Sequence, residues 1–124
     1  MMFVRIATCI AGVVVIFVVL DAAKTLALIT RDGWPQADLF DLHVGALVER
    51  LSARCGNVVA FGEMVALLWA QGNCGATVRL EHLWHELCEA KDFMLFCAYP
   101  KVGFTRDSAE SIQEICATHS RVIA

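Results

Sequence analysis

The stretch that decides the fold is Val13-Val14-Val15-Ile16-Phe17-Val18-Val19, a run composed almost wholly of β-branched residues. Gly12 precedes this run, and Asp21 follows it closely. A short, continuous apolar run is typical of a strand that is buried on both faces in a parallel sheet. We therefore predict a central buried strand at this position.

A membrane or export segment over residues 3–20 is the alternative, because Arg5 is the only charge in that stretch. A transmembrane helix needs about 20 apolar residues, and this run ends at Asp21 after roughly 18. A signal peptide needs a small-x-small cleavage site, which Leu20-Asp21-Ala22 fits poorly. Periodicity alone does not separate the two interpretations, and we favour the strand.

The composition indicates one small and very apolar domain. The chain has 124 residues, of which 58% are hydrophobic and 19% charged. Globular proteins average about 45–50% apolar and about 25% charged residues, so a disordered chain is excluded. The formal net charge of −3 argues against a nucleic-acid-binding protein, which needs a basic face.

The six cysteines do not resemble a disulfide framework. They are irregularly spaced, form no C-x-x-C pair, and several fall within apolar stripes. Free cysteine in such a stripe behaves as a small hydrophobic residue. We therefore expect reduced thiols and a cytoplasmic protein.

Downstream of Asp21, helical and extended patterns alternate. Helices are expected over residues 22–29, 39–54, 63–71, 73–91 and from Asp107 onward, and strands over residues 57–61 and 93–99. Asp38 is the expected N-cap of the second helix and Gly56 its stop, while Asp107 with Glu110 forms a capping pattern for the last helix. Strands separated by helices predict βαβ units, and hence an α/β domain with a parallel sheet covered by helices.

Three polar residues follow the predicted strands: Asp21, Glu63 and Tyr99. The carboxyl ends of parallel strands meet at one edge, where open α/β sheets bind ligands. These residues are therefore candidate ligand contacts. For Asp21 and Glu63 the alternative is that each carboxylate caps the helix that follows it.

The other candidates are weaker. His82 and His85 form an H-x-x-H on one helix face, but no third metal ligand can be named, and we expect solvated residues and no metal. His119 and Cys97 lie within apolar patterns, where packing in the core competes with ligand contact. The nucleotide-binding and hydrolase motifs are absent from the sequence, so we expect neither an enzyme nor a cofactor.

Several segments resemble the MEDS domain, the sensory domain of methanogen and methylotroph regulators. They are Phe61-Gly62-Glu63-Met64-Val65-Ala66-Leu67-Leu68-Trp69, Leu80-Glu81-His82-Leu83-Trp84 and Leu95-Phe96-Cys97-Ala98-Tyr99-Pro100, followed by Ile115-Cys116 and His119. The resemblance covers residues 12–124, and residues 1–11 form an unmatched leader. Relative to the family domain, the matching part of this chain is shortened on its N-terminal side.

The resemblance implies a three-layer, RecA-like or KaiC-like α/β fold without a working ATPase site. It also implies a small, mostly apolar ligand, with hydrocarbon derivatives proposed for the family, and signalling through a protein partner. The matching candidates for ligand binding are Glu63, Cys97, Tyr99 and His119. A shortened sheet would expose an apolar edge, so the second hypothesis is a self-associating interaction fragment of a larger sensory protein. The third hypothesis is a membrane-anchored protein that uses residues 3–20.

Overall fold

The computed structural model describes residues 3–10, 14–100 and 108–123. Its strands are β1 (Phe3–Ile10), β2 (Val14–Asp21), β3 (Thr30–Arg31), β4 (Trp34–Pro35), β5 (Asn57–Gly62) and β6 (Met94–Cys97). Its helices are α1 (Ala22–Ile29), α2 (Ala37–Phe40), the π-helical turn η1 (Asp41–Gly45), α3 (Ala46–Cys55), α4 (Met64–Ala70), α5 (Cys74–Lys91) and α6 (Ala109–Ala117). The chain is thus a mixed α/β structure.

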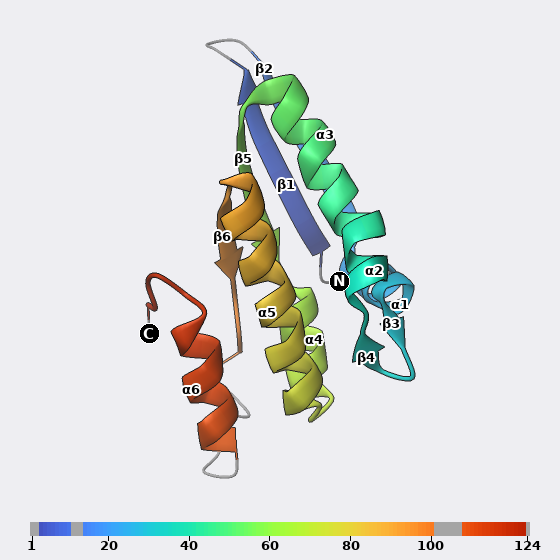
Figure 1. Ribbon diagram of the computed structural model, residues 1–124, viewed down its shortest axis with the longest axis vertical. Helices are drawn as coiled ribbons and strands as arrows, with labels where there is room; N and C mark the ends of the chain where they lie inside the picture. Colours follow the sequence, from blue (N-terminus) through green and yellow to red (C-terminus); the bar gives the residue numbers. More distant parts are fainter. Residues whose placement is uncertain (1–2, 11–13, 101–107, 124) are drawn as a thin grey trace.

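The main sheet has the strand order β2-β1-β5-β6 (Figure 1). β1 is antiparallel to both of its neighbours, whereas β5 and β6 are parallel. β2, β5 and β6 therefore run in the same direction. Arg5 pairs with Val19 on one side and Phe61 on the other, so β2 and β5 end at nearly the same level.

Three expectations about this sheet need correction. The sheet is mixed rather than wholly parallel, and residues 14–21 form an edge strand rather than a central one. Val19 of β2 is 54% exposed, so that strand is not buried on both faces. Residues 3–10, to which we assigned no element, form the interior strand β1. A β-branched run indicates a strand but does not specify its neighbours.

The structure also bears on the membrane alternative for residues 3–20. Residues 3–10 and 14–21 are strands and not parts of one helix. Among the described residues, no helix combines the length and the apolar character needed to cross a membrane.

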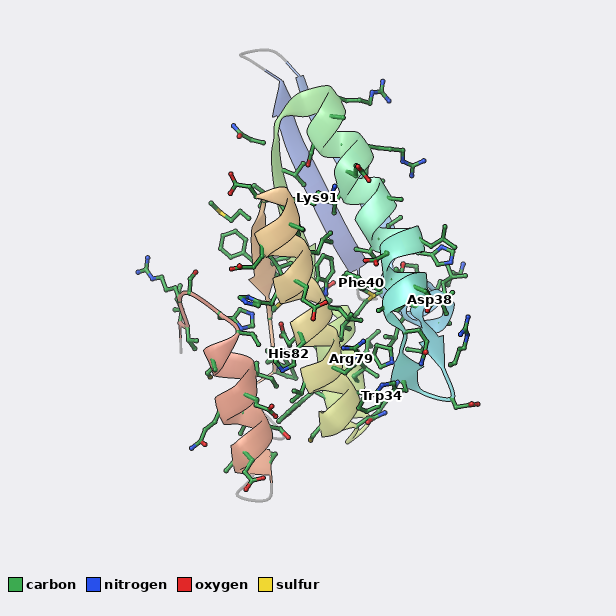
Figure 2. The ribbon with its side chains drawn as sticks, in the orientation of Figure 1. Trp34, Asp38, Phe40, Arg79, His82 and Lys91 are labelled. Atoms are coloured by element: carbon green, nitrogen blue, oxygen red, sulfur yellow. The ribbon has the colours of Figure 1, made fainter. Side chains whose placement is uncertain are left out.

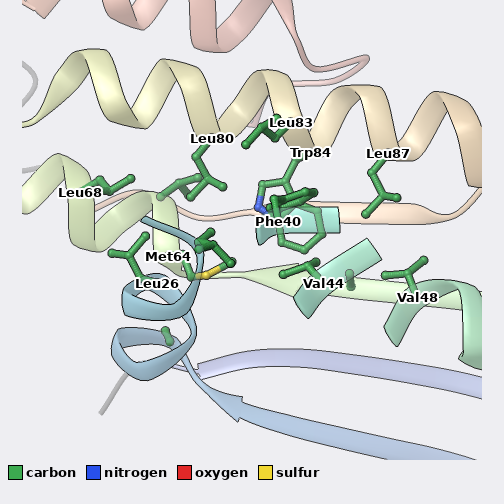
Figure 3. Packing of buried hydrophobic residues seen from close by; sticks show 14 of the residues in the cluster. Leu26, Phe40, Val44, Val48, Met64, Leu68, Leu80, Leu83, Trp84 and Leu87 are labelled. Atoms are coloured by element: carbon green, nitrogen blue, oxygen red, sulfur yellow. The ribbon is translucent and has the colours of Figure 1, made fainter. Parts of the chain in front are cut away.

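The described core lies on one face of the sheet. Figure 3 shows α5 above β5, with Trp84 directed toward Phe40. The two rings meet edge to face with centroids 5.1 Å apart, and both side chains are buried. In β5 and β6 burial alternates, and Val59, Phe61, Met94 and Phe96 are exposed on the opposite face.

The second expected helix begins earlier than predicted and contains a π-helical turn. Gln36 occupies the N-cap position, so the prediction of Asp38 was wrong, and Asp38 instead pairs with Arg31 at 3.4 Å. Gly56 ends α3 as predicted, with a left-handed φ of 78°. The predicted cap Asp107 lies outside the described residues, and α6 is preceded by Ser108.

Asn73 connects the start of α5 to a distant turn. Its Oδ1 accepts a hydrogen bond from the Ala76 N–H, and its Nδ2 donates one to the Gly33 carbonyl, both at 3.2 Å. We expect Asn73→Ala to lower the free energy of unfolding by about 1–2 kcal/mol in urea denaturation. Asn73→Asp retains the capping oxygen and should cost less. Equal losses in the two variants would contradict a capping role.

Candidate functional site

The candidate site is centred on Glu81, a buried carboxylate in the middle of α5. Its side chain is about 1% exposed, because residues 77, 80, 81 and 84 lie on the helix face that packs into the core. Three other side chains approach it, those of Cys97, Tyr99 and His119. We call these four residues the Glu81 centre.

The two carboxylate oxygens of Glu81 have different partners. The Tyr99 hydroxyl donates a hydrogen bond to Oε1. The Cys97 thiol donates to Oε2 over 3.5 Å, and His119 Nε2 also lies 3.5 Å from Oε2. Oε2 is therefore shared by a sulfur and a nitrogen, while Oε1 is oriented by the phenol.

Different elements bring these groups together. Cys97 ends β6 and Tyr99 follows two residues later, a spacing that places both side chains on the same side of an extended chain. His119 follows α6, which packs beside α5 (Figure 1). Trp69 of α4 contacts Tyr99 edge to face at a centroid distance of 6.0 Å.

The hydrogen bond at the far side of the His119 ring fixes its tautomer. Nδ1 lies 2.7 Å from the carbonyl oxygen of Ile115. A carbonyl oxygen can only accept, so Nδ1 carries a proton. The other ring nitrogen, Nε2, is the one that faces Glu81.

Burial determines the acid–base character of the centre. It raises the pKa of Glu81, whereas the hydrogen bond from Tyr99 and the proximity of His119 act in the opposite direction. Burial, and next the nearby Glu81 charge, raise the pKa of the Cys97 thiol and of the Tyr99 phenol well above their usual ranges. Neither group is ionised at neutral pH, so the isolated centre contains no ready nucleophile.

The structure brings together three of the five residues proposed from the sequence: Cys97, Tyr99 and His119. Asp21 lies at the end of β2, where its Oδ1 accepts a hydrogen bond from the Lys24 N–H at 2.9 Å, as expected for a helix cap. Glu63 is partly exposed at the end of β5 and begins α4, but its side chain makes no capping hydrogen bond.

Sequence reasoning did not select Glu81, although a signal was present. Glu81 falls four residues after Thr77 and three before Trp84, on the face that carries the apolar residues of α5. A carboxylate within an apolar helical stripe is a sign of a buried polar site, because a buried charge requires partners.

The H-x-x-H pair does not form a shared site. His82 Nε2 lies 4.0 Å from Glu114 of α6, and His85 Nε2 lies 3.9 Å from Glu89. Figure 2 shows His82 on the side of α5 nearest α6. The two imidazoles thus have separate acidic partners, and both side chains are substantially exposed.

The burial of the described cysteines predicts their order of alkylation. Cys74, Cys88, Cys97 and Cys116 are free, and Cys116 is exposed. Burial, and next the charge of Glu81, raise the pKa of Cys88 to about 11. Its alkylation should therefore be about tenfold slower than that of an ordinary thiol, because the lower thiolate fraction outweighs the higher nucleophilicity.

We expect iodoacetamide to modify Cys116 first, Cys88 later and Cys97 last, as followed by mass spectrometry of peptides from the folded protein. The same reaction in urea is the control and should remove the differences. Modification of Cys97 at the rate of Cys116 in the folded protein would contradict the buried position of Cys97.

The chain matches no protein-family model, curated protein or solved structure with which it was compared. The Glu81 centre must therefore be interpreted from its own geometry. That geometry is a buried carboxylate with a thiol, a phenol and an imidazole nitrogen directed toward it.

Proposed function

We propose that this chain is a non-enzymatic sensory module that binds a small ligand at the Glu81 centre and signals through a protein partner. One observation carries the proposal: side chains from β6, the segment after it and the end of α6 converge on a carboxylate buried in α5. Burying a carboxylate is unfavourable, and perturbed ionisable groups gather at functional sites. The Glu81 centre is therefore the best candidate for a recognition site.

The chemistry of the centre favours binding over catalysis. The Cys97 thiol and the Tyr99 phenol stay protonated because burial raises the pKa of both. In that state they are hydrogen-bonding groups rather than nucleophiles. Both groups donate hydrogen bonds to the Glu81 carboxylate. Among the described residues they do not form a chain of hydrogen bonds that leads to an activated hydroxyl or thiolate.

The surroundings favour a mostly apolar ligand. Trp69, Val78 and Ile115 form a small buried cluster, and Tyr99 and Ile112 pack against it. A ligand with an apolar body and one polar group could pack its body against the partly buried Tyr99 and Ile112 and direct its polar group toward Glu81. The side chain of His119 is 17% exposed, and Cys97 and Tyr99 are also only partly buried, so the centre is not fully closed to solvent.

The relation to the MEDS domain belongs to the same proposal. The alternation of strands and helices and the common direction of β2, β5 and β6 support it. The proposed three-layer, RecA-like arrangement would require a further layer over the exposed face of β5 and β6. The antiparallel β1 is a departure from the pattern that the resemblance implies.

The test is a ligand screen with matched variants. The probes are short-chain alcohols, ketones and halogenated alkanes, followed by thermal shift and calorimetry. We expect at least one saturable binder, with an affinity about tenfold lower in Tyr99→Phe, which corresponds to one lost hydrogen bond. Glu63→Ala and Asp21→Asn then test whether the ligand reaches the ends of β5 and β2. A folded protein that responds to no probe would contradict the proposal.

Association between copies of the chain is a second candidate, favoured by a different observation. Five large apolar side chains are exposed on one sheet face: Val19, Val59, Phe61, Met94 and Phe96. Register places four of them side by side, since Val59 pairs with Met94 and Phe61 with Phe96. Val19 is separated from Phe61 by Arg5 of β1, which pairs with both. Exposed apolar side chains grouped in this way are typical of a surface that contacts another protein, and a second copy of the chain could supply the same surface. Light scattering at several concentrations tests this, and a monomer throughout would exclude it.

A further inference from the structure

The Glu81 centre contains three chemically different donor atoms at distances suited to one metal ion. Glu81 Oε2 lies 3.5 Å from both Cys97 Sγ and His119 Nε2. The ligand atoms of these three residues all lie within 4.8 Å of one another. Tetrahedral zinc has metal–sulfur distances of about 2.3 Å and metal–nitrogen or metal–oxygen distances of about 2.0–2.2 Å, so its ligand atoms are about 3.3–3.7 Å apart. The two distances to Oε2 already fall in this range.

The contacts behind these atoms are those that orient metal ligands. His119 Nδ1 faces the Ile115 carbonyl at 2.7 Å, and Nε2 is the ring nitrogen directed toward Glu81. The Tyr99 hydroxyl donates a hydrogen bond to Oε1 of Glu81. Oε2 is therefore the carboxylate oxygen that could bind a metal together with Cys97 Sγ and His119 Nε2. Metal-binding histidines usually donate their second ring N–H to a carbonyl or carboxylate, and metal-binding carboxylates are themselves hydrogen-bonded.

The donor set also selects the kind of metal. A sulfur and a nitrogen donor exclude magnesium and calcium, which take oxygen ligands. A divalent ion with one thiolate, one carboxylate and one neutral imidazole forms a complex of zero net charge, which suits a buried position. Three protein ligands leave a fourth tetrahedral position open, as in zinc sites that bind an exchangeable molecule.

We propose that Glu81, Cys97 and His119 form a binding site for a divalent zinc-class ion whose fourth position takes water or the sensed molecule. This inference deepens the proposed function and rests on it in placing the ligand at the Glu81 centre. On binding, the Cys97 S–H bond breaks, its proton passes to solvent, and the sulfur lone pair forms the bond to the metal. Any proton on Glu81 leaves in the same way, and no electron is transferred.

Zinc and cobalt titrations of the full chain, reduced and freed of metal, provide the test. Zinc affinity is measured in competition with a chromophoric chelator, and circular dichroism checks that each variant is folded. We expect one zinc ion per chain, and at least about a 100-fold loss of affinity in His119→Ala and Cys97→Ser, since removal of an outer contact alone costs 10–100-fold. His82→Ala is the matched control and should change the affinity less than twofold.

Cobalt reports on the same site in the unaltered protein, so the inference stays testable if a variant does not fold. We expect the visible bands of tetrahedral cobalt together with a thiolate-to-cobalt charge-transfer band. Either of two results would overturn the site: no stoichiometric zinc binding, or binding lost in His82→Ala but retained in His119→Ala. If organic probes still bind when zinc does not, the metal site falls and the proposed function stands. If zinc binds and no organic probe does, the metal site stands and the sensory proposal falls.

Discussion

Replacing Glu81 with alanine is expected to lower the free energy of unfolding by about 3 kcal/mol, measured by urea denaturation in buffer containing a chelator. The substitution removes the acceptor for the Tyr99 hydroxyl and the Cys97 thiol and leaves both buried donors without that partner. Each lost hydrogen bond costs about 1–3 kcal/mol, and the vacated volume adds to this loss. Burial of the Glu81 carboxylate is itself unfavourable, so its removal offsets part of the loss of unfolding free energy.

Two variants separate these contributions. Glu81→Gln keeps the side-chain volume and an acceptor oxygen for Tyr99, so its cost should be only about 1 kcal/mol. Glu86 lies on the exposed side of the same helix, and Glu86→Ala should change stability by less than about 0.5 kcal/mol. If Glu81→Ala were as mild as Glu86→Ala, the buried position of Glu81 would be wrong.

Trp84→Ala is expected to have the largest effect on stability, a loss of about 4 kcal/mol. Trp84 is fully buried at the centre of the core, between Phe40 and Phe93. Removing a large aromatic side chain from such a site typically costs about 3–5 kcal/mol, because the surroundings collapse only partly into the cavity. Thermal or urea unfolding followed by circular dichroism measures the change.

Trp84→Phe tests the polar part of the same side chain. The buried indole N–H has no hydrogen-bond acceptor among the described residues, so the tryptophan retains a desolvation penalty that phenylalanine lacks. We therefore expect Trp84→Phe to cost no more than about 1.5 kcal/mol. A loss as large as that of Trp84→Ala would indicate that the indole N–H has a partner and contributes to stability.

Local patterns predicted much of the secondary structure. Three features could be predicted because each depends on residues only a few positions apart. They are the apolar stripe on α5, the end of α3 at Gly56 and the helix cap at Asp21. The strand order of the sheet could not be predicted from local patterns, because strand pairing depends on residues that are far apart in the sequence. Residues 3–10 were therefore assigned no element, and β2 was taken for a central strand.

The candidate site shows the same division. Tyr99 was selected for its position at the end of a predicted strand. Cys97 and His119, for which core packing was the competing interpretation, were candidates because of the resemblance to the MEDS domain. The residue that connects them, Glu81, was passed over, because it becomes a site only when β6 and the end of α6 lie against α5. Asp21 was selected for its place after a strand, and its observed contact is the local cap.

The central claim is that distant residues meet at Glu81 to form one polar centre. The most direct test is a double-mutant cycle on unfolding free energies with Glu81→Leu and Tyr99→Phe. We predict a coupling of about 1–2 kcal/mol, because Tyr99→Phe removes the hydrogen bond to Glu81 in the wild type, whereas in Glu81→Leu that bond is already absent. Asn73→Ala with Glu81→Leu is the control and should be additive. A loss from Tyr99→Phe that is the same in both backgrounds, to within about 0.3 kcal/mol, would contradict the claim.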